Sequence, residues 1–310
     1  MAFIQKYKAY ILGIYAFLVF VHFVIKDYIF PISIIFYAFP IIIIIPFGLL
    51  TSWFYRKKKV LVYFLIGFSL ILSYHWFNNY YVFPVSKTLS EKDSSILFWN
   101  VAKNSKGLPL DVIFEKIKEY NIDILTFVEA ENILQKDIIA LKKEFRDYSF
   151  KKLKGNMLIG VKGKIDSVFY KSKKKSYKFN IIESTIDGTT SKIIIVDIYA
   201  SPFFSKRDAL KDVLSFSTEN NIDIIVGDFN TPYESIHFKN YEINYKSFHD
   251  YSDGLTATWP YGIPLLELDQ IWLNKTNQPI QLNKFQYLFS DHKLLIAEYR
   301  SSTKKGITPH

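Results

Sequence analysis

The sequence has 310 residues and no cysteine, and this absence excludes several kinds of chemistry. The chain can form no disulfide bond, bind no metal through thiolates and use no cysteine nucleophile. A bound metal ion must be held by oxygen or imidazole ligands, and this donor set suits hard cations such as magnesium or manganese. The length fits a single domain of up to about 250 residues with an additional segment attached.

Acidic residues are scarce at the start of the chain, where Asp27 stands against six lysines and Arg56 within the first 86 residues. The same segment contains three long apolar runs without acidic or basic side chains other than histidine, at 10–25, 29–50 and 60–77. Each run is close to the about 20 residues that an α-helix needs to cross a bilayer. A cleavable signal peptide is the alternative for the first run, but a small-residue cleavage site is missing and two further runs follow. We therefore predict a membrane domain over residues 1–86 with three transmembrane α-helices.

The basic residues that flank these runs predict the orientation of the chain in the membrane. Lys6 and Lys8 lie before the first run, and an Arg-Lys-Lys-Lys segment at 56–59 lies between the second and the third. Both positions are expected on the cytoplasmic side, so three crossings place everything after Phe77 outside. We expect a multi-pass protein of the plasma (inner) membrane with an extracytoplasmic catalytic domain. The lipid bilayer is its expected partner, and the sequence indicates no protein partner.

From Ser95 onward, apolar strand-like runs alternate with amphipathic helical runs. The predicted strands are 96–102, 122–130, 157–161, 165–170, 177–184, 192–199, 221–227, and the segments LDQIWLN and HKLLIAEY near the C-terminus. The predicted helices begin at Pro109, Asn132 and Ser205. This mixture predicts a layered α/β domain over residues 95–300. A linker at 87–94 precedes this domain, and a polar tail at 301–310 follows it.

Polar side chains occur where several of these buried strands end. In the segment NIDIIVGDFNTP (221–232), an apolar strand breaks at Gly227 and continues with Asp228 and Asn230. A plain turn is the alternative, because Gly, Asp, Asn and Pro all favour turns. Asn100 and Glu129 occupy similar positions in two earlier strands. Burying one unpaired polar group costs a few kcal/mol, so a set of such groups suggests that they compensate one another around a cation.

These segments together resemble the endonuclease/exonuclease/phosphatase superfamily, which includes DNase I-like nucleases, exonuclease III-like enzymes, sphingomyelinases and inositol-phosphate phosphatases. The motifs that carry the resemblance are WNV, FVEA, VGDFNTP, LDQIWL and SDHKLL, in the order of the family. They span about residues 95–300. The resemblance implies a four-layer α/β sandwich of two mostly antiparallel or mixed β-sheets flanked by helices. It also implies a metal-dependent phosphoester hydrolase site between the two sheets.

The resemblance implies a metal site and a water-positioning pair. Glu129 matches the principal metal-binding glutamate, and Asn100 and Asp291 are expected near the same Mg²⁺ or Mn²⁺ ion. Asp228 and Asn230 match the pair that positions the attacking water. A carboxylate can accept the proton of this water, and an amide can orient it without adding charge.

The resemblance also implies a phosphate-binding group. His292 is expected to contact the phosphate, and Asp269 is expected to hold this histidine and favour its cationic form. Many members carry a histidine where this chain has Tyr199, whereas exonuclease III-like and apurinic endonucleases resemble this chain in having a tyrosine there. A phenol can donate a hydrogen bond to phosphate, and a packed core tyrosine is the alternative reading of this position.

We therefore predict a membrane-anchored, divalent-metal-dependent phosphoester hydrolase acting as a phosphodiesterase, with nuclease activity among the options. Its substrate would be nucleic acid, a phospholipid or a small phosphoester. A phosphomonoesterase or a phospholipid-headgroup phosphodiesterase on the same site is the alternative. A non-catalytic binding protein is disfavoured because every charged catalytic position is filled. The lysine-rich segment 171–178 is interpreted as a solvated hairpin rather than a nucleic-acid site, and His237 and His249 as surface loop residues.

Overall fold

The computed structural model describes residues 2–83, 93–102 and 107–301, which divide into two compact units. The first unit contains the chain up to Val82, and the second contains most of the chain after it. Most of the predicted linker at 87–94 and of the polar tail at 301–310 lies outside the described residues.

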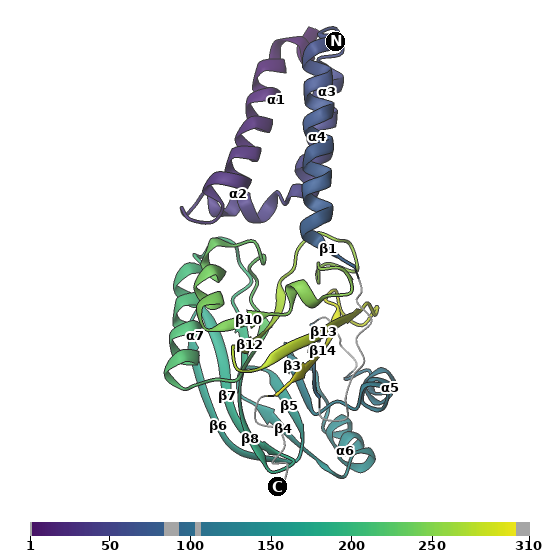
Figure 1. The fold of residues 1–310 in the computed structure, drawn as a ribbon, viewed down its shortest axis with the longest axis vertical. Helices are drawn as coiled ribbons and strands as arrows, with labels where there is room; N and C mark the ends of the chain where they lie inside the picture. Colours follow the sequence, from purple (N-terminus) through teal and green to yellow (C-terminus); the bar gives the residue numbers. More distant parts are fainter. Residues whose placement is uncertain (1, 84–92, 103–106, 302–310) are drawn as a thin grey trace, which may run out of the picture. The chain divides into compact units, whose positions relative to one another are not determined.

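The N-terminal unit is built from apolar helices (Figure 1). They are α1 (Ala2–Phe20), which continues as the π-helix η1 (Val21–Ile25), α2 (Ser33–Ala38), α3 (Ile41–Phe54) and α4 (Lys59–Tyr80), followed by the short strand β1 (Tyr81–Val82). Two helical stretches, Tyr7–Ile25 and Lys59–Tyr80, are long and apolar enough to cross a membrane. A Cβ atom on Gly48 of α3 would lie 2.6 Å from the Tyr15 hydroxyl and 2.7 Å from Ser69 Oγ. Glycine therefore allows α1, α3 and α4 to approach closely at this point.

The second predicted membrane run, 29–50, does not form one helix. It divides into the six-residue α2 and the 14-residue α3, which are separated at Phe39 and Pro40. Pro40 has an extended backbone conformation and caps α3, as expected for a residue that cannot donate a hydrogen bond to a continuing helix. Two helices rather than three therefore meet the length for a membrane span among the described residues.

The C-terminal unit contains two six-stranded mixed β-sheets. The first sheet has the order β13-β14-β2-β3-β5-β4, and the second has the order β10-β12-β9-β8-β7-β6. Only the central pairs β2–β3 and β8–β9 are parallel among the paired strands of these sheets in the described residues. The strands of the first sheet are β2 (Ser94–Asn100), β3 (Ile124–Val128), β4 (Tyr148–Leu153), β5 (Met157–Lys162), β13 (Gln278–Phe285) and β14 (Leu294–Arg300). Those of the second are β6 (Lys164–Lys173), β7 (Tyr177–Ile186), β8 (Thr189–Ile198), β9 (Ile224–Asp228), β10 (Tyr245–Ser247) and β12 (Asp269–Asn274).

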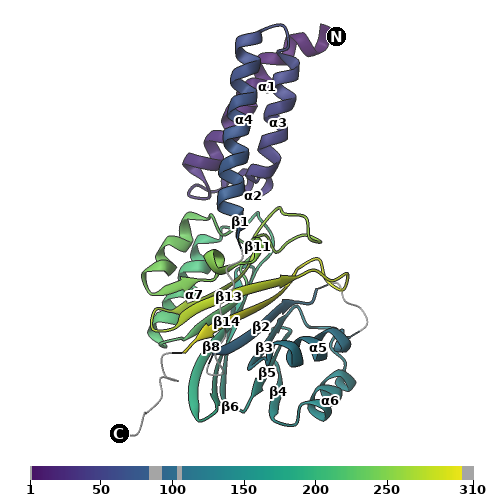
Figure 2. The ribbon, with the colours of Figure 1, turned by 45° about the vertical axis from the view of Figure 1, so that its right-hand side comes forward.

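Helices cover the outer faces of the two sheets (Figures 1 and 2). The remaining elements are α5 (Leu110–Tyr120), α6 (Gln135–Glu144), α7 (Arg207–Glu219), the 3₁₀ helices η2 (Ile236–Ile243) and η3 (His249–Tyr251), and the short strand β11 (Gly254–Leu255). The period-2 alternation of strands explains how each sheet serves two cores. On β2, Ile96 and Phe98 join the core between the sheets, whereas Leu97 and Trp99 join the core under α5 and α6. The observed layers thus confirm two mixed sheets flanked by helices.

Candidate active site

Three aspartates lie side by side on neighbouring strands of the second sheet. Asp197 of β8 is in register with Asp228 of β9, and Asp228 is in register with Asp269 of β12. Residues in register point to the same face of a sheet. This face is the one toward the other sheet, because Val226, two residues before Asp228, belongs to the core between the sheets. All three aspartates are buried.

Gly227 lets this row of strands pack closely at the site. A Cβ atom at this position would lie 2.0 Å from the carbonyl oxygen of Val196 on β8. Any other residue would push β9 away from β8 and separate Asp228 from Asp197. The glycine in the GDFN segment is therefore required by packing against the neighbouring strand as well as by the chain reversal that follows.

The first sheet contributes Asn100, the last residue of β2, and Glu129, which follows β3. The Asn100 side-chain nitrogen donates a hydrogen bond of 2.9 Å to Oδ2 of Asp228 and one of 3.4 Å to Oε1 of Glu129. Its side-chain oxygen accepts a 2.9 Å bond from the backbone nitrogen of Ala102, which is consistent with this orientation of the amide. Asn100 therefore links the two sheets through the carboxylate that ends β9.

His292 lies between two of the aspartates. Its Nδ1 atom is 2.8 Å from Oδ2 of Asp269, and its Nε2 atom is 3.9 Å from Oδ2 of Asp228. Burial lowers the pKa of His292, but the carboxylates of Asp269, Asp228 and Asp291 together raise it by more, and the net pKa is about 10. The imidazole is therefore a buried cation at neutral pH.

The segment that carries His292 is fixed to the neighbouring strand β2. The Ser290 hydroxyl donates a 2.7 Å bond to the backbone oxygen of Asn100 and accepts a 3.0 Å bond from the backbone nitrogen of His292. The Trp99 indole donates a 3.1 Å bond to the backbone oxygen of His292. These bonds explain why the Ser-Asp-His motif has serine at its first position: the hydroxyl places the histidine beside the carboxylates.

Asp228 is buried at the centre of the site, and its surroundings perturb its ionisation. Burial raises its pKa well above the ordinary value, and the adjacent Asp269 carboxylate raises it further, while the His292 cation lowers it. A carboxylate in such surroundings has an increased tendency to bind a proton. This tendency is the property that a general base requires.

Asn230 lies in a turn that Asp228 stabilises. The backbone nitrogen of Asn230 donates a 2.8 Å bond to Oδ1 of Asp228, and its side-chain nitrogen donates a 2.8 Å bond to the backbone oxygen of Ile198. Phe229, between them, is fully buried against Phe238. The GDFN segment is therefore both a turn, as in the alternative reading of the sequence, and part of the polar cluster.

Two predicted site residues lie at the margin of this cluster. Asp291 is buried and accepts a 3.0 Å bond from the Trp259 indole in the loop at 256–262, and its charge contributes to the raised pKa of His292. Tyr199 follows β8, and 41% of its surface is exposed, so it is not a core tyrosine. It shares a pocket with Glu129.

The residues of the site fit a hard divalent cation. Asp228, Asp269 and His292 are all buried and place possible ligand atoms within 4.8 Å of one another. The two carboxylates supply the donors, because a cationic histidine has no lone pair for a metal. Oδ1 of Asp269 is buried and has no hydrogen-bond partner in the part of the chain that the structure describes. Carboxylate oxygens are the ligands that magnesium and manganese prefer. This set differs from the predicted one, because Asp228, Asp269 and His292 were assigned to catalysis and Glu129, Asn100 and Asp291 to the metal.

Three charged residues of the site were not predicted from the sequence. Asp197 forms a 2.9 Å ion pair with Lys178, and burial raises the pKa of Asp197 to about 6, although Lys178 opposes this shift. Lys206 is buried and donates a hydrogen bond to the backbone oxygen of Tyr199, and burial lowers its pKa to about 8. The available signal was the same as for Asn100: Asp197 interrupts the apolar run IIIVDIY.

His249, interpreted as a surface residue, is buried in the structure. Its Nδ1 atom lies 2.7 Å from Oε2 of Glu267, and its ring stacks on Tyr233 at a centroid distance of 3.9 Å. Burial lowers the pKa of His249, but the carboxylates of Glu267 and Asp250 together raise it by more. The surface assignment was wrong because a loop sequence gives no sign of a carboxylate partner 18 residues away.

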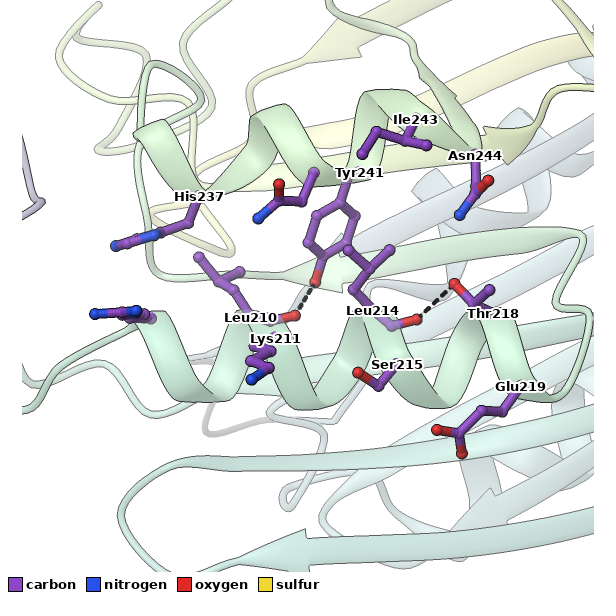
Figure 3. A pocket seen from close by; sticks show the side chains of 12 residues that line it. Leu210, Lys211, Leu214, Ser215, Thr218, Glu219, His237, Tyr241, Ile243 and Asn244 are labelled. Atoms are coloured by element: carbon purple, nitrogen blue, oxygen red, sulfur yellow. Dashed lines mark hydrogen bonds between the residues drawn. The ribbon is translucent and has the colours of Figure 1, made fainter.

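A second, larger pocket lies outside this cluster. It has a volume of about 600 Å³ and lies between α7 and η2 (Figure 3). The Tyr241 hydroxyl of η2 donates a 2.8 Å hydrogen bond to the backbone oxygen of Leu210 on α7, and both residues line the pocket. None of the eight predicted site residues lines it. Its size alone does not make it the candidate, because the histidine and the carboxylate in its lining, His237 and Glu219, lie at opposite ends of it and do not converge (Figure 3).

Comparisons with known proteins agree with the geometry. The Endonuclease/Exonuclease/phosphatase family matches residues 97–292. No curated protein sequence matches the chain. Among solved structures, D. rerio TDP2 complexed with single strand DNA product is 14% identical with a TM-score of 0.54, and the match covers 68% of this chain and 100% of that one.

Two further solved structures share the fold. The human Nocturnin catalytic domain with bound sulfate is 16% identical with a TM-score of 0.50, and the match covers 69% of this chain and 95% of that one. The Bacteroides thetaiotaomicron mannosyl-6-phosphatase is 11% identical with a TM-score of 0.51, and the match covers 66% and 99% of the two chains. At these identities the likeness concerns the fold of the C-terminal unit.

Proposed function

Because the chain belongs to the Endonuclease/Exonuclease/phosphatase family, it is a phosphoester hydrolase, and we propose that it is a divalent-metal-dependent phosphodiesterase anchored in a membrane. One observation carries the proposal. Asp228 is buried between the amide of Asn100 on one side and the His292–Asp269 pair on the other. A potential base and a cation thus converge at one point between the sheets.

Different residues of the site would have different roles in phosphoester hydrolysis. Asp228 accepts the proton of the attacking water, because its surroundings favour the protonated carboxyl. Asn230 orients this water. His292 is held in its cationic form by Asp269 and donates a hydrogen bond to a phosphoryl oxygen, where negative charge develops in the transition state.

Glu129 would hold the metal ion, and Asn100 orients its carboxylate through a 3.4 Å hydrogen bond. When bound, Mg²⁺ or Mn²⁺ neutralises charge on the phosphoryl group and makes water easier to deprotonate. Asn100 contributes a neutral donor between Glu129 and Asp228, which reduces the repulsion between these carboxylates before the ion binds.

The fold is shared by enzymes of different specificity, so the choice between diester and monoester needs a further argument. TDP2 was solved with single strand DNA product, whereas another relative of the same fold is a mannosyl-6-phosphatase. The pocket that contains Glu129 has a volume of about 470 Å³ and continues away from the carboxylates along the β6–β7 hairpin. Space beyond the metal ligand supports a substrate with a group on each side of the phosphate, which is a diester.

A substrate panel tests the proposal. The full chain in detergent is incubated with single-stranded DNA, RNA, sphingomyelin, and aryl phosphate mono- and diesters, with Mg²⁺ or Mn²⁺ and with a chelator. We expect hydrolysis of diesters that a chelator abolishes. Hydrolysis of monoesters alone, or full activity in excess chelator, would contradict the proposal.

The three-crossing topology and the extracytoplasmic position of the catalytic unit belong to the same proposal. In addition to the two long helical stretches, α2 and α3 would together form a crossing, the second along the chain. Pro46 lies inside α3, and a proline is tolerated in a membrane helix. A reporter that is active only outside the cytoplasm, fused after His310, is expected to be active. Activity of a cytoplasm-only reporter at the same position would reverse the orientation.

A further inference from the structure

We propose that the β6–β7 hairpin is a binding site for a second phosphate of the substrate, and that the substrate is a single-stranded oligonucleotide. The inference rests on the proposed phosphodiesterase function and names its substrate class. The residues that would form the site are Tyr170, Lys173, Lys174, Lys175 and Tyr199. The sequence alone favoured a solvated hairpin here.

The hairpin lies beside the candidate active site. One pocket of about 470 Å³ is lined both by Glu129, Asp197 and Tyr199 and by Tyr170 and residues 172–178 of the hairpin. The two groups are adjacent, because Lys178 pairs with Asp197 at 2.9 Å and the backbone nitrogen of Tyr199 donates a 2.9 Å bond to the backbone oxygen of Ser176. A ligand with one phosphate beside Glu129 therefore extends directly over the lysines.

The lysines of the hairpin differ in how firmly the protein holds them. Lys178 is held by Asp197 at 2.9 Å, and Lys171 lies 3.6 Å from the centre of the Phe216 ring. Lys173 forms a longer, 3.4 Å pair with Asp212 in which both side chains are partly exposed. Such exposed pairs contribute little stability, so Lys173 can exchange its partner. Lys174 and Lys175 are exposed at the tip of the hairpin.

The pocket combines positive charge with aromatic rings. Single-stranded nucleic acid is bound by grooves that carry positive charge along the backbone and aromatic side chains against the bases. Tyr199 lines the same pocket as Glu129 and the hairpin, and 41% of its surface is exposed. Tyr170 lines the pocket as well and is half-buried. The pocket thus offers lysines to the phosphates and two tyrosine side chains to the bases of a flexible strand.

The tip of the hairpin argues against a phospholipid. Its residues from Ser172 to Ser176 are serines and lysines only, so they provide no apolar surface for an acyl chain. A small monoester would occupy the carboxylate end of the pocket and leave the lysines without a function. The oligonucleotide is the ligand class that uses both ends.

The test compares Lys174→Gln/Lys175→Gln with Lys142→Gln/Lys143→Gln, a pair of exposed lysines on α6. Binding of a fluorescent 12-nucleotide single-stranded DNA to the full chain in detergent is measured by anisotropy in chelator over a range of salt. We expect the hairpin variant to bind about tenfold more weakly or worse, and the slope of log affinity against log salt to fall by about 1.4 for two lost phosphate contacts. The α6 variant is expected to bind like the wild type.

Kinetics separate this inference from the proposed function. With Mg²⁺, the hairpin variant is expected to have a raised KM for the oligonucleotide and an unchanged kcat/KM for an aryl phosphodiester. If the hairpin variant binds DNA more weakly but the wild type hydrolyses no diester, the hairpin site would be supported and the proposed phosphodiesterase function would be contradicted. Equal DNA binding by the hairpin variant and the α6 variant would overturn the hairpin site. A hairpin variant that loses activity only on sphingomyelin vesicles would overturn it as well.

Discussion

The side-chain nitrogen of Asn100, at the end of β2, donates a 2.9 Å hydrogen bond to Asp228, at the end of β9 in the opposite sheet. Both residues are buried, and 128 positions separate them in the chain. This bond is a direct polar connection between the two sheets at the candidate site. It holds the proposed base in place and supplies a neutral donor to a carboxylate whose other neighbours include two aspartates in register.

Removing this donor is expected to destabilise the site. Asn100→Ala leaves a buried carboxylate oxygen with one donor fewer, and such a loss costs about 1–3 kcal/mol. Asn100→Asp instead places a further negative charge beside Asp228 and Glu129, so its melting temperature should fall without metal and recover when Mg²⁺ is added. Thermal unfolding with and without Mg²⁺ measures both effects. Asn180→Ala, which removes a buried amide on β7, should lose stability without a change in the Mg²⁺ response.

Glu129→Gln tests the proposed metal ligand. The substitution keeps the size of the side chain and removes its charge, so the Mg²⁺ concentration for half-maximal activity should rise by roughly tenfold or more, at least as much as loss of an outer-shell partner. Glu131→Gln is the matched control, because Glu131 is exposed and bonds to Asn156 at 3.2 Å. Equal Mg²⁺ dependence of the two variants would remove Glu129 from the metal site.

Asp269→Asn should change the pH dependence of the reaction. Burial lowers the pKa of His292 and the Asp269 carboxylate raises it, with a net pKa of about 10 against an ordinary 6.5. A raised pKa in the folded state means that the pair stabilises the protein fully below pH 6.5 and stops doing so as the pH rises through about 10. Activity that needs the cationic histidine should therefore fall on the alkaline side near pH 10.

In Asp269→Asn the charge that raises this pKa is absent, so the alkaline limb of the kcat/KM profile should move to lower pH. A fall in activity at all pH values without movement of that limb would mean that Asp269 has a structural role only. His292→Gln, which cannot become a cation, should lack the limb altogether.

The sequence predicts the central strands well because they are buried on both faces. β2, β3, β9 and β14 are continuous apolar runs, and such runs indicate a strand without knowledge of its partners. The strands β4 and β13 were not predicted, and they are the two edges of the first sheet. β4 places lysines on its exposed side, and β13 contains Pro279. Edge strands tolerate such residues, so their sequences resemble loops.

The sequence predicts individual residues of the site, but it does not predict which of them contact one another. Asn100, Asp228 and His292 each interrupt or flank an apolar strand, and this local signal identified them. Their mutual contacts depend on which strands pair and which faces meet, and that information is spread over the whole chain. Asp197 is an example. It also interrupts an apolar strand, but only its register with Asp228 identifies it as a residue of the site.

The last prediction concerns the unit formed by Asp228 and His292. Asp228→Asn removes the proposed proton acceptor and His292→Ala removes the proposed phosphate contact, and each should lower kcat by roughly 100- to 10,000-fold. Residues that act in one step are not additive, so the double variant should be little slower than the slower single variant. Steady-state kinetics of the four proteins measures this coupling, and circular dichroism checks that each is folded.

Asp223→Asn supplies the control for this cycle. Asp223 precedes the same strand at its other end and accepts bonds from the Asn274 side chain at 2.7 Å and from the Lys192 backbone at 2.9 Å. Its loss should reduce stability while kcat stays close to that of the wild type. If folded Asp228→Asn hydrolyses the diester as fast as Asp223→Asn, then Asp228 takes no proton in the reaction and the carboxylate serves only to close the turn at Asn230.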